Sequence, residues 1–214
     1  MLDYLEDGLD VDGVDNSPEM LALCRARAAE SGLEVDHRLF QQEMEALSLP
    51  RRYATLIVPS SSFQLLTDPA AAARALARFH DHLEPGGLVV VPFMSKLWPG
   101  RRTPPQMQWA DMVKVAEATR PGDGAVIRRW MRTCFDHEQQ LLHEENRYEM
   151  LRDGEVVETE LHLRSPSVRW YSQGQALDLF APAGLAVTAI TSGFSLDPAG
   201  PDDTLFCILA TRAT

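Results

Sequence analysis

The sequence predicts an α/β fold with a Rossmann-like, open and mostly parallel sheet. Two observations support this class. Up to Phe93, apolar segments of strand length alternate with helical segments, and each helical segment has residues that typically start and stop a helix. The composition, 45% hydrophobic and 24% charged over 214 residues, is that of an ordinary globular protein with enough chain for a buried core.

The first unit is a strand, a helix and a second strand. Residues 9–15 alternate apolar and polar side chains, as a short strand does. Ser17 is placed to cap the helix that follows, and Pro18 suits its first position. Gly32 is a typical stop, and residues 34–40 form the second predicted strand.

The second unit has the same strand–helix–strand order. Residues 53–59 form a nearly continuous apolar run, which is typical of a strand buried on both faces. A helix is expected from Asp68, with Pro69 at its first position. Residues 85–87 stop this helix before a strand at 88–93. We expect the four strands to pair in one parallel sheet.

The pattern changes after Phe93, and the segments expected there are the following. One helix is predicted near 106–118, then an antiparallel meander of strands at 125–136, 139–152 and 156–171, a helix at 173–181, and a terminal antiparallel hairpin of strands at 185–192 and 204–211. We therefore divide the chain into an α/β domain, residues 1–94 and 172–214, and an inserted helix with a meander, residues 95–171, that acts as a lid or in dimerisation.

Charge and cysteine use restrict the possible partners and location. Twenty Lys and Arg against thirty-one Asp and Glu give a formal charge of −11, which disfavours nucleic acid and anionic lipid surfaces as partners. Three widely spaced cysteines suggest neither a disulfide framework nor a zinc site. No apolar run has the length of a membrane span, and the acidic N-terminus does not resemble a secretory signal. We therefore expect a cytoplasmic protein with no metal and no membrane contact.

Polar residues follow three of the predicted strands, where ligands bind in open parallel sheets. Asp15 ends the first strand, and its carboxylate can accept hydrogen bonds from both hydroxyls of a ribose. The alternative is a solvated turn or a cap for the next helix. Glu43 follows the second strand and can accept from an adenine amine, although a lone surface Glu is usually inert. Ser60 and Ser61 follow the third, where serine is also ordinary turn chemistry.

Four segments in register resemble the class I S-adenosylmethionine-dependent methyltransferases, and the resemblance extends over nearly the whole chain. The segments are residues 11–21, 42–47, 61–66 and 83–90, and the order and spacing of all four are similar to those of the family. The ending, with Arg169-Trp-Tyr-Ser172 and the terminal hairpin, also looks like the end of that family's sheet.

The resemblance implies S-adenosylmethionine as cofactor and assigns residues to it. Asp15 would hold the ribose hydroxyls with Asn16 beside it, and Glu43 would receive the adenine amine while the backbone of Met44 contacts the ring. The remaining cofactor residues would be Ser60 and Ser61 on the methionine half and Phe63 closing the pocket.

Three departures from the family are visible. Only 14 residues precede Asp15, so the chain is expected to lack the family's first strand and glycine-rich loop. Ala54 stands where the family commonly has Asp, and Glu43 is one methylene longer than the usual Asp. Loss of the loop would weaken cofactor binding and leave strand edges open. We expect direct pairing of the flanking strands, a partner chain or a ligand to close the gap, and we favour a homodimer.

Methyl transfer needs alignment of the reacting groups more than a fixed catalytic set, so no catalytic residue is assigned. Candidate acceptor contacts are aromatic and basic residues after the fifth family strand, although such residues in strands are more often core or solvated. They are Trp98, Arg101, Trp109, Arg169 and Tyr171, together with Trp130, His137 and Tyr148.

The leading hypothesis is thus a small-molecule methyltransferase. One alternative is a catalytically impaired or non-catalytic methyltransferase-like protein that acts as an interaction module. Another is a dinucleotide-dependent oxidoreductase, because Asp15 would serve equally well on a dinucleotide ribose. The absence of a second nucleotide-binding half from the sequence argues against that third possibility.

Overall fold

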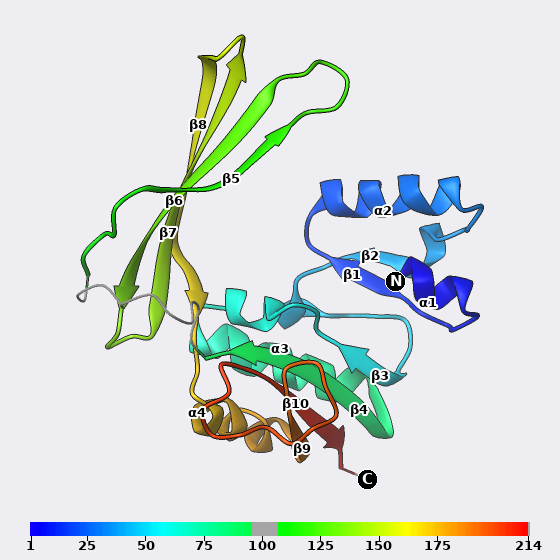
Figure 1. The fold of residues 1–214 in the computed structure, drawn as a ribbon. Helices are drawn as coiled ribbons and strands as arrows, with labels where there is room; N and C mark the ends of the chain where they lie inside the picture. The colour runs from blue at the N-terminus through cyan, green and yellow to red at the C-terminus, as the bar shows by residue number, and fades with distance from the viewer. Residues whose placement is uncertain (96–106, 214) are drawn as a thin grey trace.

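A computed structural model describes residues 1–95 and 107–213 of the chain (Figure 1). The helices in these ranges are α1 (Leu2–Glu6), α2 (Pro18–Glu30), α3 (Pro69–His82) and α4 (Gln173–Asp178), with short 3₁₀ turns η1 (Asp36–Arg38), η2 (Met44–Ala46), η3 (Ser62–Leu65) and η4 (Ala181–Ala183). The strands are β1 (Gly13–Asp15), β2 (Leu39–Gln41), β3 (Tyr53–Ile57), β4 (Leu83–Met94), β5 (Val113–Thr119), β6 (Val126–Asp136), β7 (Leu141–Arg152), β8 (Glu155–Arg169), β9 (Leu185–Ser192) and β10 (Leu205–Arg212).

The N-terminal unit is a small parallel sheet, β1–β2, with its own core. Ser17 caps α2 by accepting the Met20 amide at 3.1 Å, and Pro18 occupies the first helical turn as expected. Leu21 and Ala28 of α2 are buried against β2. The short α1 packs its apolar side against the same core.

The central sheet has the order β3-β4-β10-β9. β3 and β4 are parallel, and the terminal hairpin β9–β10 adds antiparallel to β4, which confirms the predicted hairpin. One face of α3 is buried against this sheet, with Leu76 fully buried and Phe79 nearly so. Phe93 of β4 lies at the centre of the core, and four aromatic rings surround it at centroid distances of 5.6–6.4 Å.

The third sheet is antiparallel, in the order β5-β6-β7-β8, and extends away from the rest of the chain (Figure 1). Three of its strands match the predicted meander. The helix predicted near 106–118 is wrong over its described part, because residues 113–119 form β5. There Val113 and Val115 favour a strand, and pairing with β6 provides the hydrogen bonds that a helix would have supplied internally.

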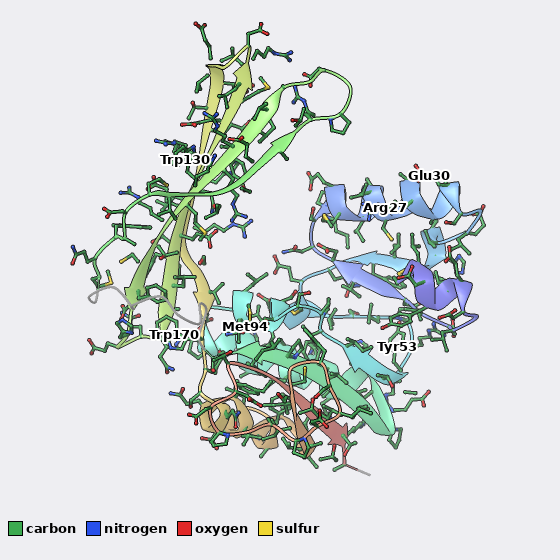
Figure 2. The ribbon with its side chains drawn as sticks, viewed as in Figure 1. Arg27, Glu30, Tyr53, Met94, Trp130 and Trp170 are labelled. Atoms are coloured by element: carbon green, nitrogen blue, oxygen red, sulfur yellow. The ribbon has the colours of Figure 1, made fainter. Side chains whose placement is uncertain are left out.

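The α/β, Rossmann-like class is confirmed, but the expectation that four strands form one parallel sheet is wrong. In the described part of the chain, β1–β2 and β3–β4 belong to separate sheets, so the flanking strands do not pair directly. Polar contacts bridge them instead. The hydroxyl of Tyr53, labelled in Figure 2, donates to Asp12 at 2.7 Å, and Arg51 contacts Asp10 and Asp12.

Two further strand predictions need correction. Residues 34–38 are not a strand, because η1 occupies Asp36–Arg38 and β2 begins only at Leu39. β3 is not buried on both faces. It is an edge strand in the described structure, and Ile57 is 56% exposed. Apolar composition indicated a strand here, but burial depends on which neighbours cover it.

Candidate active site at the ends of β1, β2 and β3

The parallel pair β1–β2 brings two of the predicted acidic positions to one sheet edge. Asp15 is in register with Gln41, and the Gln42 amide donates to the Asp15 carbonyl at 3.2 Å. The Gln41 side chain donates to the Asn16 carbonyl at 3.4 Å. Glu43 and Met44 follow directly, so the segments that carry Asp15, Asn16, Glu43 and Met44 are neighbours.

Asp15 makes a turn contact just before α2, whereas Ser17 is the residue that caps the helix. Asp15 Oδ1 accepts the Ser17 amide at 2.9 Å. Within the described residues, Oδ2 has no hydrogen-bond partner. A carboxylate can accept on both oxygens, so the turn contact leaves Asp15 able to bind another donor.

The segment after β2 is closed by one side chain. Gln42 Oε1 accepts the Ser48 amide at 2.7 Å, and Gln42 Nε2 donates to the Ser48 carbonyl at 3.1 Å. Glu43 is exposed within this closed segment, whereas Met44 packs against the main core. The segment therefore has a fixed shape while Glu43 faces solvent.

The turn after β3 has an uncommon backbone. Ser60 and Ser61 both have positive φ values, 49° and 59°, and the Ser62 amide donates to the Pro59 carbonyl at 3.0 Å. Left-handed geometry in a residue other than glycine costs about 1–2 kcal/mol, and such strain clusters at functional sites. The strained backbone therefore favours a functional role for Ser60 and Ser61 over an ordinary turn.

Phe63 lies in the main core. Its side chain is fully buried, with an edge contact to Phe93 at 5.6 Å and a tilted contact to Phe79 at 6.4 Å. Its role in closing a cofactor pocket stays a prediction from the resemblance.

The described acceptor candidates do not all lie at one place. Trp98 and Arg101 lie outside the described residues. Trp109 lies under the Arg132 guanidinium at 5.0 Å, near β6. Arg169 and Tyr171 serve the framework: Arg169 donates to the Thr67 and Gln139 carbonyls, and Tyr171 packs against Phe93, with burial raising the pKa of its hydroxyl.

The other aromatic candidates belong to the β5–β8 sheet and its turns. Trp130 donates to Glu149 at 2.8 Å in that sheet (Figure 2), and Tyr148 packs edge-on against His162. His137 stacks with Phe135, and both contact the Trp170 ring.

Sequence reasoning missed Gln64, which is 1% exposed. Its carboxamide donates to the Met94 and Arg169 carbonyls at 3.1 and 2.9 Å and accepts the Met94 amide at 2.7 Å. Met94 ends β4 and Arg169 ends β8, so Gln64 joins the two points where the chain leaves for and returns from the β5–β8 sheet. A polar residue in an apolar segment was the only available signal.

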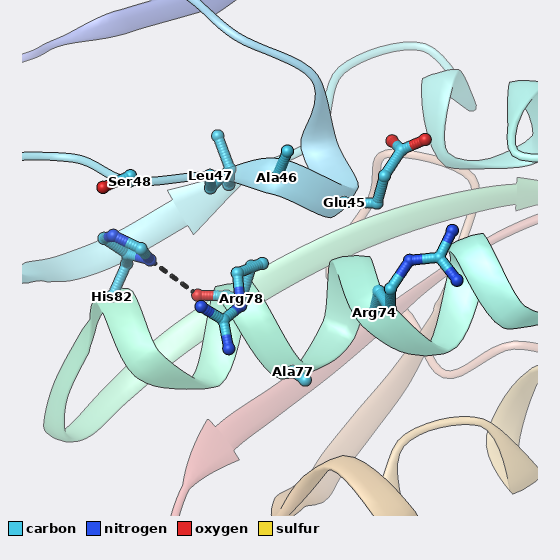
Figure 3. Close-up of a pocket in the computed structure, with 8 residues that line it drawn as sticks. All are labelled: Glu45, Ala46, Leu47, Ser48, Arg74, Ala77, Arg78 and His82. Carbon is cyan, nitrogen blue, oxygen red and sulfur yellow. Dashed lines mark hydrogen bonds between the residues drawn. The ribbon is translucent and has the colours of Figure 1, made fainter.

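Two shallow grooves of about 500 and 370 Å³ are present on the described surface. The larger lies between the segment after β2 and the exposed face of α3 (Figure 3). The smaller lies by α1 and the loop before β1. Neither is lined by Asp15, Glu43 or Ser60.

The described residues contain neither a side-chain cluster placed to hold a metal ion nor a helix suited to cross a membrane. No group of three or more His, Cys, Asp and Glu side chains is placed to hold a metal ion. None of the helices in this part of the chain has both the length and the apolar character needed to cross a membrane.

Part of the chain that includes Asp15, Glu43 and Ser60 is similar to a known protein family. Residues 1–87 match the family model described as a methyltransferase domain. The sequence matches none of the curated proteins with which it was compared.

Solved structures share the fold. An S-adenosylmethionine-dependent methyltransferase from Clostridium acetobutylicum is 16% identical with a TM-score of 0.74, over 94% of this chain and 74% of that one. The CcbJ methyltransferase from Streptomyces caelestis is 19% identical with a TM-score of 0.74, over 98% and 77%. The sugar N-methyltransferase KedS8 from a Streptoalloteichus species is 23% identical with a TM-score of 0.65, over 96% and 72%. Residues 1–87 therefore match a methyltransferase domain, and the chain shares the fold of these methyltransferase structures.

Proposed function

We propose that this chain binds S-adenosylmethionine at the edge formed by the ends of β1, β2 and β3 and transfers its methyl group to a small-molecule acceptor. The observation that carries the proposal is the parallel register of β1 and β2. It sets Asp15 beside Gln41 and Gln42, directly before Glu43, within the residues that match the methyltransferase domain.

The residues present fit the nucleoside half of the cofactor. Asp15 has a carboxylate oxygen without a partner in the described structure, suited to the ribose hydroxyls, and Asn16 lies beside it. Glu43 is exposed and would accept from the adenine amine, while the Met44 backbone would contact the ring. Ser60 and Ser61, in their strained turn, would line the methionine half.

Bound S-adenosylmethionine supplies an activated methyl group on a sulfonium. The role of the chain is to hold the nucleoside and to orient an acceptor in line with that group. Trp109, in the segment just before β5, remains a candidate acceptor contact. Arg169 and Tyr171 act by holding the framework, as their contacts indicate.

A small-molecule acceptor is supported by the charge and by the structural relatives. The net charge of −11 disfavours nucleic acid. Similar folds include a protein described as an amino pentose methyltransferase and others described as a sugar and a glycopeptide N-methyltransferase. We propose an acceptor of that general size and a cytoplasmic location, which fits three cysteines that are all free.

We also propose a homodimer through the β5–β8 sheet, within an insert of residues 95–171 between the two parts of an α/β domain, 1–94 and 172–214. β8 is an edge strand in the described structure, and Leu161 and Leu163 on it are 66% and 63% exposed. Two copies of β8 paired antiparallel about Leu161 would set Glu158 opposite Arg164 of the other copy. Opposite charges at such positions stabilise cross-strand pairs.

The binding proposal is tested by calorimetric titration with S-adenosylhomocysteine. Asp15→Ala removes a charge-assisted acceptor, so affinity should fall about tenfold or more. Asp36→Ala, which removes an exposed carboxylate on η1, is the matched control and should bind like wild type. Equal affinity in the two variants would contradict the assignment, and a wild-type chain that binds nothing would favour the non-catalytic interaction module.

A further inference from the structure

His82, the last residue of α3, contacts the segment that carries the adenine-side residues. Leu49 follows the loop that Gln42 closes through Ser48, and the Leu49 amide donates to His82 Nε2 at 2.9 Å. The imidazole thus links α3 to the end of the segment that presents Glu43.

The partners of the imidazole define its protonation state. His82 Nδ1 lies 2.8 Å from the Arg78 carbonyl, which can only accept, so Nδ1 must carry a proton (Figure 3). The Leu49 amide can only donate, so Nε2 must carry none. The arrangement requires the neutral ring. A histidine in the last turn of a helix would ordinarily be explained by its charge, and this geometry excludes that explanation here.

We propose that neutral His82 is a positioning residue for the Glu43–Met44 segment, so that protonation of its imidazole weakens cofactor binding at acidic pH. The proposal rests on the proposed function. A proton on Nε2 would face the Leu49 N–H, and neither group could accept. The segment would lose this hydrogen bond to α3, and Glu43 would be held less firmly.

The effect should be graded rather than all-or-none. Leu47 is buried in the main core and Met44 packs against the same core, so the segment keeps two apolar anchors when the hydrogen bond is lost. One net hydrogen bond corresponds to roughly a fivefold change in an equilibrium constant.

The imidazole is reachable by solvent and is surrounded by charges of both signs. It lines the groove of about 500 Å³, so protons have access to it. The charged residues that line the same groove are Arg74 and Arg78 of α3 and Glu45 of η2. Asp81, beside His82 in sequence, pairs with Arg78 at 2.8 Å, and Arg52 donates to the Asp81 carbonyl.

The test is the pH profile of S-adenosylhomocysteine affinity, measured by calorimetry between pH 5.5 and 8 for wild type and three variants. Wild-type affinity should be roughly fivefold lower at pH 5.5 than at pH 8. His82→Gln supplies an amide oxygen that accepts the Leu49 N–H without titrating, so its affinity should stay near the wild-type value at pH 8 and remain flat. His82→Ala should be weak throughout. His80→Gln, on the same helix, should keep the wild-type profile.

A His82→Gln profile that falls like wild type would overturn the inference, as would a flat wild-type profile. Either result leaves the proposed function intact if Asp15→Ala still loses affinity at pH 8. A second readout does not depend on the cofactor. Amide exchange in the ligand-free chain should be faster for residues 42–49 in His82→Ala than in His82→Gln, and equal exchange in the two would also overturn the inference.

Discussion

The side chains of Gln64 and Arg169, 105 positions apart, join the same two segments by hydrogen bonds in both directions. The Gln64 carboxamide donates to the Arg169 carbonyl at 2.9 Å, and the Arg169 guanidinium donates to the Thr67 carbonyl, near Gln64, at 2.8 Å. The same carboxamide holds both the amide and the carbonyl of Met94. Gln64 lies in η3, directly after the strained Ser60–Ser61 turn. Gln64, which holds the base of the β5–β8 sheet, is therefore only a few residues from the Ser60–Ser61 turn of the candidate site.

Gln64→Ala should destabilise the chain by about 2–4 kcal/mol, because it leaves the amide and carbonyl of Met94 and the Arg169 carbonyl without partners in a buried place. Urea unfolding followed by circular dichroism measures the change. Gln108→Ala, at an exposed position, is the control and should alter stability by less than about 0.5 kcal/mol. Equal stability of the two variants would show that the Gln64 hydrogen bonds contribute nothing net.

Tyr53 should make stability fall in alkali. Burial, together with its hydrogen bond to Asp12, raises the pKa of Tyr53 to about 12. The unfolded chain titrates near the ordinary value of about 10. A raised folded-state pKa contributes stability that is complete below the unfolded value and is lost as pH rises toward the folded one.

The measurement compares the urea-unfolding free energy of wild type and Tyr53→Phe between pH 8 and 12. Wild type should be more stable by about 1–2 kcal/mol below pH 10, and this advantage should disappear between pH 10 and 12. Tyr4→Phe, at an exposed tyrosine, is the control. An advantage that persists unchanged at pH 12 would be inconsistent with the Tyr53–Asp12 contact.

Ser60→Gly should raise the free energy of unfolding by about 0.5–1 kcal/mol, because glycine adopts the positive φ of 49° without steric cost. The same variant should bind S-adenosylhomocysteine less tightly if the serine hydroxyl lines the site. Ser62→Gly is the matched control: Ser62 has no positive φ and its hydroxyl donates to the Pro59 carbonyl at 2.7 Å, so this change should destabilise. Destabilisation by Ser60→Gly would mean that the turn is not strained there.

The proposed β8 interface predicts that Leu161→Asp is a monomer at concentrations where wild type sediments as a dimer. Two carboxylates would face each other across the two-fold axis, and like charges directly opposite destabilise a strand pair. Leu196→Asp, at an even more exposed residue in the β9–β10 loop, is the control and should remain dimeric. In the same experiment, a monomeric wild type would contradict the interface.

A symmetric disulfide tests the register itself. Leu161→Cys should cross-link under mild oxidation, since the residue would oppose its own copy, whereas His162→Cys should not. Efficient cross-linking only at 162 would place the two-fold axis at that residue and would contradict the register centred on Leu161.

Local sequence features predicted most elements, because caps, prolines and apolar periodicity act within a few residues. The Ser17 cap, the α3 start at Asp68–Pro69 and the terminal hairpin all appear as expected. Sheet membership could not be predicted in this way. Whether β1 pairs with β3 depends on contacts between distant segments, such as Tyr53 with Asp12, that no local pattern encodes.

In the candidate site too, local features could be predicted and contacts between distant segments could not. The parallel order of β1 and β2 followed from the strand–helix–strand pattern, and it correctly brought Asp15 close to the residues before Glu43. An aromatic side chain after a strand suits a pocket wall and a core equally well, so the burial of Phe63 in the core could not be predicted. His82 and Gln64 act on backbone groups of remote segments. The sequence around His82 gives no sign of this, and at Gln64 the one sign is a polar residue in an apolar segment.

Cofactor binding at the Asp15–Glu43 edge can be observed in a crystal structure of the chain with S-adenosylhomocysteine. We expect both ribose hydroxyls within about 2.5–3.2 Å of the Asp15 carboxylate, the adenine amine against Glu43 and the Met44 backbone beside the ring. A ligand ordered elsewhere on the molecule, with Asp15 still bound to the Ser17 amide and to nothing else, would contradict it.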